Sequence, residues 1–118
     1  MEMEMDAKDV ANRVAKGAKR YDQQKPDWWS TKNIDIESLH QGHPRADVVG
    51  QNRKNEADWN GQFDYSVLGL GSIQEAAAEG FYFTVDEDGF TDSKSDTVKE
   101  NELLTEAWRQ EILARRRS

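Results

Sequence analysis

His40 and His43 are the two histidines of the chain, and their spacing of three residues invites a metal-binding interpretation. Carboxylates stand nearby in the sequence, at Asp35, Glu37 and Asp47. A catalytic zinc site needs three protein ligands that are themselves held in place by further hydrogen bonds. The glycine and the proline beside the histidines place the pair in a loop rather than on a rigid face. We therefore predict no metal and no cofactor.

An enzyme would have to be built around Gln51, His40 and the nearby carboxylates, as a small hydrolase or a nucleotide-binding domain. The chain has 23 acidic residues, so a pair of carboxylates can always be imagined. Only a buried pair with shifted pKa values would carry acid–base chemistry. The enzyme is therefore the weaker interpretation, and the sequence predicts no catalytic residue.

Two glycine-containing motifs do not fulfil the requirements of the sites that they resemble. Gly69 to Gly71 resembles the start of a dinucleotide-binding loop, but Gln74 occupies the position of the third glycine. Asp86 to Gly89 resembles part of a calcium loop, but Thr84 and Ser95 stand where a carboxylate and a bidentate glutamate are needed. Neither motif predicts a ligand.

The strongest helix signal lies between Thr97 and Arg115, where one half of the helical wheel is apolar and the other half is polar. Thr97 and Glu100 match a capping box, which places the start of the helix at Thr97. We expect Trp108 to anchor this helix in the core. The apolar half consists of Leu103, Leu104, Ala107, Trp108 and Ile112.

A second amphipathic helix is predicted from Asp6 to Gln23, with Asp6 as its N-cap. Its narrow stripe of small residues favours close packing against the C-terminal helix. Gly17 costs about 1 kcal/mol relative to alanine inside a helix, which favours a close crossing at this position. The stripe consists of Ala7, Val10, Ala11, Val14, Ala18 and Tyr21.

Between the two helices, Pro26 ends the first helix and is followed by Trp28 and Trp29. Adjacent side chains cannot both point inward, so we expect one tryptophan in the core and the other near the surface. An exposed tryptophan is a candidate for partner recognition. The alternative is that both tryptophans cover the gap between the helices. The segment from Ile34 to Leu39 alternates apolar and acidic residues, which fits either a short strand or a helical turn that begins at Asp35.

The remaining segments contain the β-structure signals. Asn60-Gly61 between aromatic residues indicates a hairpin turn. Ser72 and Glu75 match a capping box for a helix of about two turns that ends at Gly80. Phe81 to Val85 has strand propensity, and Asp86 to Asp96 is expected to be a mobile acidic loop. The predicted fold is mainly α, or α+β: terminal helices packed around a short helix and a small hairpin or strand.

Composition predicts one soluble domain over residues 1–118, with residues 1–5 disordered. The chain has no cysteine, no signal peptide and no apolar run that could span a membrane, so we expect a cytoplasmic protein. The formal net charge is −7, and the region from Asp86 to Glu106 alone carries −6. A basic stretch from Lys8 to Arg20 and three terminal arginines oppose it, but nucleic-acid binding is not favoured.

Four short motifs follow one another along most of the chain: Pro26-Asp27-Trp28, Ile34 to Leu39, Val48 to Gln51, and Leu104 to Trp108. With the N-terminal helix, they resemble a family of small uncharacterised proteins encoded by phages and prophages of actinobacteria. A cysteine usually precedes the Val-x-Gly-Gln motif in that family, and Asp47 stands there in this chain. The resemblance implies an accessory protein and supplies no reaction.

We therefore expect a protein that binds a host or phage protein and modulates it, with no prediction for the oligomeric state. The candidate contact residues are Trp28, Trp29, Gln51, Asp86 and Asp88. The tryptophan is expected to set the dissociation rate, and the acidic region the association rate. The alternatives are an acidic mimic of nucleic acid and the small enzyme considered above.

Overall fold

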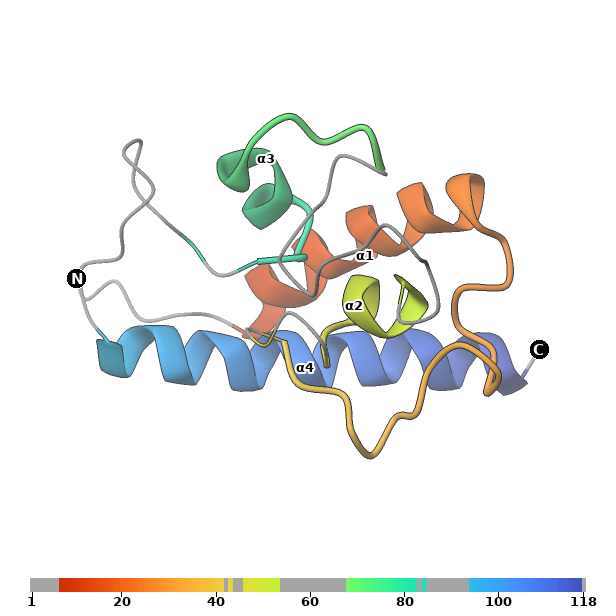
Figure 1. Ribbon diagram of the computed structural model, residues 1–118. Coiled ribbons are helices and arrows are strands. Elements are labelled where there is room, and N and C mark those ends of the chain that lie inside the picture. The colour runs from red at the N-terminus through yellow and green to blue at the C-terminus, as the bar shows by residue number, and fades with distance from the viewer. Residues whose placement is uncertain are drawn as a thin grey trace.

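The computed structural model describes residues 7–41, 43, 46–53, 68–82, 84 and 94–117, and only the backbone of residues 94–97. Within these ranges the regular structure is entirely helical (Figure 1). The helices are α1 (Ala7–Gln24), α2 (Val48–Arg53), α3 (Ile73–Ala78) and α4 (Lys94–Arg117). The mainly α prediction is thus confirmed. None of the helices so described is both long and apolar enough to cross a membrane.

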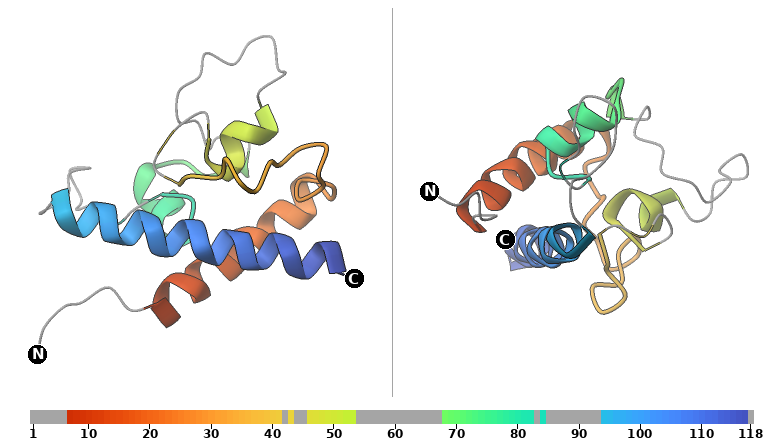
Figure 2. Two further views of the ribbon diagram at one scale, coloured as in Figure 1. Left: turned by 90° about the horizontal axis from the view of Figure 1, so that it is seen from below. Right: turned by 90° about the vertical axis from the view of Figure 1, so that its left-hand side faces the viewer.

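The two long helices, α1 and α4, cross and contact each other, as the amphipathic patterns predict. Figure 2 shows the crossing in its left view, and its right view looks along α4 with α1 on one side and α2 on the other. An aromatic cluster fills the space between the helices. Its members are Tyr21, Trp28, Phe81 and Trp108, with exposed fractions between 0% and 3%.

The C-terminal helix begins at Lys94, three residues before the predicted N-cap. Thr97 therefore lies inside α4, and the capping box of Thr97 and Glu100 is wrong. Glu100 is 3% exposed and has another role: its carboxylate accepts hydrogen bonds from the backbone N–H and the hydroxyl of Thr84. It also pairs with Arg13 at 2.8 Å. The capping pattern does not hold because this carboxylate joins α4 to α1 and to Thr84.

The stripe of α1 is confirmed at Val10, Val14, Ala18 and Tyr21, whereas Ala7 and Ala11 are exposed. Ala7 and Ala11 therefore lie on the solvent side of the first turns, although Val10 in the same turns is fully buried. Gly17 does mark a close approach, but to Glu79 and Phe81 rather than to α4. A Cβ atom at Gly17 would clash with the backbone oxygen of Glu79.

Helix α3 follows its prediction closely. The Ser72 hydroxyl accepts a hydrogen bond from the backbone N–H of Glu75 at 3.1 Å, while the Glu75 carboxylate accepts one from the backbone N–H of Gly71. Gly80 has a φ of 76°, a conformation that favours glycine, and it ends the turn after the helix. Its position against Val14 brings α3 onto α1, where Arg13 donates to the backbone oxygen of Ala77.

The predicted β-structure is not confirmed within the described residues. Of the expected strand from Phe81 to Val85, the structure describes Phe81, Tyr82 and Thr84, and these form bends and irregular backbone without a strand partner. Phe81 is buried, as expected, because its ring joins the aromatic cluster. The Asn60-Gly61 turn lies outside the described residues. Of the predicted acidic loop, Lys94 to Asp96 belong to α4 and the preceding positions are not described.

The segment from Ile34 to Leu39 forms a turn, which settles the open choice in favour of the helical-turn interpretation. The Asp35 carboxylate accepts hydrogen bonds from the backbone N–H of Glu37 at 3.1 Å and from the Ser38 hydroxyl at 2.8 Å. Ile34 and Leu39 are buried on either side of this turn. An acidic side chain that caps its own turn removes the need for a strand partner.

Most of the arginines at the two ends of the chain are used inside the fold. Arg20 forms two hydrogen bonds with the Glu79 carboxylate, and Arg116 donates to the backbone oxygens of Trp29 and Ile34. Arg115 pairs with Asp22 at 2.7 Å, and its guanidinium lies 5.4 Å from the centre of the Trp28 ring. These three arginines therefore have partners within the fold.

The pairing of Asp22 with Arg115 predicts a pH-dependent contribution to stability. Hydrogen bonds from Arg115, together with one from the Trp28 indole, hold the pKa of Asp22 below its ordinary value. A carboxyl whose pKa is lowered by folding stabilises the protein above its unfolded pKa, about 3.9 for aspartate. This stabilisation is lost as the pH falls through the folded pKa.

We therefore expect Asp22→Asn to lower the melting temperature at neutral pH. The difference from the wild type should be smaller when both are compared at about pH 3. That pH lies below the unfolded pKa of aspartate, so part of the stabilisation by the charge on Asp22 is lost there. Thermal unfolding followed by circular dichroism measures the difference. A gap that stays constant between the two pH values would show that the charge on Asp22 contributes nothing.

Candidate functional site

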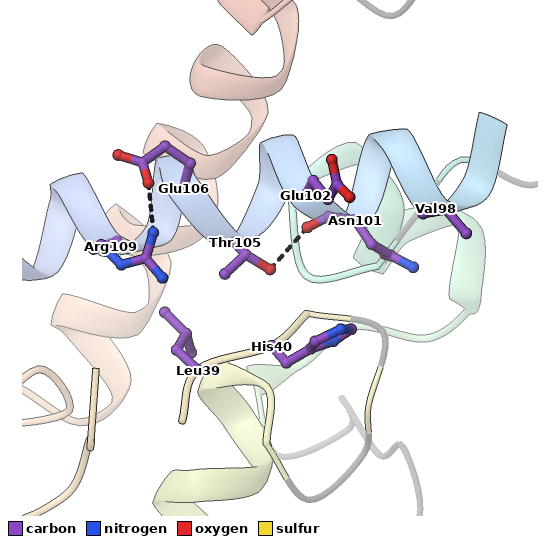
Figure 3. A pocket seen from close by; sticks show the side chains of 8 residues that line it. All are labelled: Leu39, His40, Val98, Asn101, Glu102, Thr105, Glu106 and Arg109. Carbon is purple, nitrogen blue, oxygen red and sulfur yellow. Dashed lines mark hydrogen bonds and ion pairs between the residues drawn. The ribbon is translucent and has the colours of Figure 1, made fainter. Parts of the chain in front are cut away.

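An open groove of about 470 Å³ runs between α4 and the loop at Leu39 and His40 (Figure 3). Its α4 wall uses side chains that follow one another at helical spacings of three and four residues. The loop wall lies opposite and belongs to a segment about 60 residues earlier in the chain. The lining residues are Leu39, His40, Val98, Asn101, Glu102, Thr105, Glu106 and Arg109.

The two walls are fixed to each other by hydrogen bonds. The Thr105 hydroxyl accepts from the backbone N–H of Gln41 at 2.9 Å and donates to the backbone oxygen of Asn101 at 2.8 Å. The side chain of Gln41 is fully buried, and its oxygen accepts from the backbone N–H of Val48. The loop is therefore held between α4 and α2, and the groove is already formed in the free protein.

The apolar part of the groove is provided by Leu39 and Val98. Leu39 is 4% exposed, whereas Val98 is 54% exposed and is one of two large hydrophobic side chains noted as exposed among the described residues. The other is Ile73 on α3, at 41%. An exposed valine beside a hollow can pack against an incoming side chain, whereas Ile73 does not line the groove.

The charges of the groove are not equivalent. Hydrogen bonds from Gln110 and Arg109 lower the pKa of Glu106, so this carboxylate and the Arg109 guanidinium largely satisfy each other. Glu102 is exposed, and no ion pair or hydrogen bond engages its side chain within the part of the chain that the structure describes. Glu102 is therefore the negative charge of this groove that remains available.

Asn101 brings an amide to the same wall. Figure 3 shows its amide nitrogen pointing toward the loop side of the groove, near His40. Its Oδ1 atom is buried and has no hydrogen-bond partner among the described residues. The amide nitrogen is thus a donor that faces the groove, where a carbonyl oxygen could accept from it.

Of the two tryptophans predicted as contact residues, Trp28 is fully buried. Its ring stacks on Tyr21 at 5.1 Å and meets Trp108 edge-on at 5.4 Å, while its indole N–H donates to Asp22. The prediction of Trp28 as a surface contact is therefore wrong, because its ring is buried in the aromatic cluster. Trp29 is half-buried and packs against the core, so the two side chains are buried to different degrees.

Gln51 is 5% exposed, so it too is wrong as a surface contact. Its side-chain oxygen accepts from the backbone N–H of Asp35, and its nitrogen donates to the backbone oxygens of Asp35 and Ala46. Gln51 therefore fastens α2 to the preceding turn. The other two predicted contact residues, Asp86 and Asp88, lie outside the described residues.

His40 and His43 are both exposed, and His40 Nδ1 lies 2.9 Å from the backbone oxygen of Gln41. Asp47, one of the carboxylates considered with them, is buried and accepts from the backbone N–H of Gly50 at the start of α2. No group of three or more potential metal ligands occurs within the described ranges. His40 enters the candidate site only as part of the groove wall.

Comparisons of the chain with protein-family models, with curated proteins and with solved structures found no match.

Proposed function

We propose that this protein is a small phage or prophage accessory protein that binds another protein through the groove beside α4 and modulates it. The observation that carries the proposal is the position of Val98, a largely exposed aliphatic side chain at the edge of a preformed hollow. Because Val98 belongs to a helix, little conformational entropy of the backbone is lost when a partner binds to it. The resemblance to phage and prophage proteins supports the biological setting.

The size of the groove favours a short segment of the partner as its occupant. A volume of about 470 Å³ accommodates a few side chains. Peptide recognition of this kind uses pockets for particular side chains together with hydrogen bonds to the main chain. Val98 and Leu39 provide apolar surface at opposite ends of the groove, and Asn101 provides the main-chain donor.

The enzyme alternative gains no specific support from the groove. The Thr105 hydroxyl donates to the backbone oxygen of Asn101, so its proton is engaged within the helix. His40 is not hydrogen-bonded to that hydroxyl in the described contacts, as a nucleophile and its base would be. The acidic-mimic alternative depends on Asp86 and Asp88, which lie outside the described residues.

The proposal is tested by affinity capture from an actinobacterial lysate with wild-type protein, Val98→Asp and Ile73→Asp as baits. The two variants make the same change at the two exposed aliphatic positions, so general effects of added charge are matched. We expect a specific partner to be retained by the wild type and by Ile73→Asp but lost with Val98→Asp. Equal recovery on all three baits would place the binding surface elsewhere.

A further inference from the structure

The groove also indicates the chemistry of its occupant, an inference that rests on the proposed function. Its available charge is negative, because Glu102 has no partner in the described contacts while Glu106 is engaged by Arg109 and Gln110. An incoming anion would meet this free carboxylate, and like charges brought together without compensation are unfavourable. A lysine or arginine would instead complement it.

The spacing of the two contact points adds a second constraint. Val98 and Glu102 are four residues apart on α4, which corresponds to a rise of about 6 Å along the helix. In an extended chain, side chains on the same face are two residues apart, or about 6.6–6.8 Å. An extended segment could therefore place one side chain against Val98 and the next one on that face against Glu102.

We propose that the groove binds an extended segment of a partner protein with an aliphatic residue and a lysine or arginine two positions apart. The aliphatic side chain packs on Val98, and the cation pairs with Glu102. The Asn101 amide nitrogen, which faces the groove, donates to a main-chain carbonyl of the segment (Figure 3). The apolar contact supplies the anchor, and the ion pair selects the sign of the neighbouring charge.

The test is a selection of binders from a displayed library of short random peptides, performed on four baits. These are the wild type, Val98→Asp, Glu102→Lys and Glu37→Lys. Glu37 is exposed and does not line the groove, so Glu37→Lys makes the same charge change outside it. Circular dichroism of each bait checks that it is folded before selection.

We expect the wild type and Glu37→Lys to enrich peptides with an aliphatic and a basic residue at a spacing of two. Glu102→Lys should enrich aspartate or glutamate at the basic position and bind the wild-type peptides at least about tenfold more weakly. This inference alone would be overturned if the peptides lost with Val98→Asp showed no preference for a basic residue. It would also be overturned if they showed that preference and Glu102→Lys did not reverse it. If the wild type enriches no peptide whose binding is lost with Val98→Asp, the proposed peptide-binding function is overturned as well.

Discussion

Trp108→Ala is expected to leave the protein largely unfolded at room temperature. The Trp108 side chain is fully buried, and its ring lies 5.0 Å from Phe81 and 5.4 Å from Trp28, centre to centre. Replacing a buried tryptophan by alanine costs about 3–5 kcal/mol. The indole N–H also donates to the backbone oxygen of Gly80 at 2.7 Å, and losing that bond leaves a buried acceptor unpaired. The total is comparable with the whole stability of a small domain.

Trp108→Phe is the matched variant, because it keeps an aromatic ring and removes the indole N–H. It should lie between the wild type and Trp108→Ala in urea unfolding followed by circular dichroism, since part of the ring contacts remain. A melting temperature of Trp108→Ala within a few degrees of the wild type would contradict the packing of α4 described here.

Gly17→Ala is expected to destabilise the protein, against the usual effect of this substitution in a helix. Alanine is normally favoured over glycine inside a helix by about 0.5–1 kcal/mol. Here the added Cβ would clash with the backbone oxygen of Glu79 and lie 3.0 Å from the Phe81 ring. Relief requires α1 to move away from the turn after α3, and overpacking of this kind costs about 1–3 kcal/mol.

Ala15→Gly serves as the control for Gly17→Ala, because position 15 is exposed on the same helix. It should destabilise by no more than about 1 kcal/mol, which is the intrinsic cost of glycine in a helix. Both changes are measured as free energies of unfolding in urea. If Gly17→Ala raises stability, α1 and the turn at Glu79 are not in close contact.

The long helices could be predicted from the sequence because their apolar residues repeat with the period of a helix. Val14, Ala18, Leu104 and Trp108 are buried as that repeat requires. The start of α4 was misplaced because the Thr-x-x-Glu pattern matches a capping box, whereas the carboxylate of Glu100 binds other partners. Glu100 has two, Arg13 and Thr84, and both are distant in the sequence.

The candidate site was harder to predict. Glu102, Glu106 and Arg109 lie on the polar half of the predicted C-terminal helix, so its periodicity indicated a shared face but not a groove. What makes this face a groove is the loop at Leu39, which a tertiary hydrogen bond from Gln41 to Thr105 holds in place. Such a contact leaves no local trace in the sequence. The tryptophan pair, by contrast, was conspicuous in composition, but Trp28 serves the core.

The most direct test of the binding groove is the dissociation constant of the captured partner for the wild type, Val98→Asp and Ile73→Asp. Val98 lines the hollow and Ile73 does not, although both are exposed aliphatic residues of the described chain. The groove predicts a dissociation constant at least about tenfold higher for Val98→Asp, because a charge would be buried against the apolar anchor. Ile73→Asp should leave it unchanged. Equal affinity of all three proteins, or a loss confined to Ile73→Asp, would contradict the assignment of this groove as the binding site.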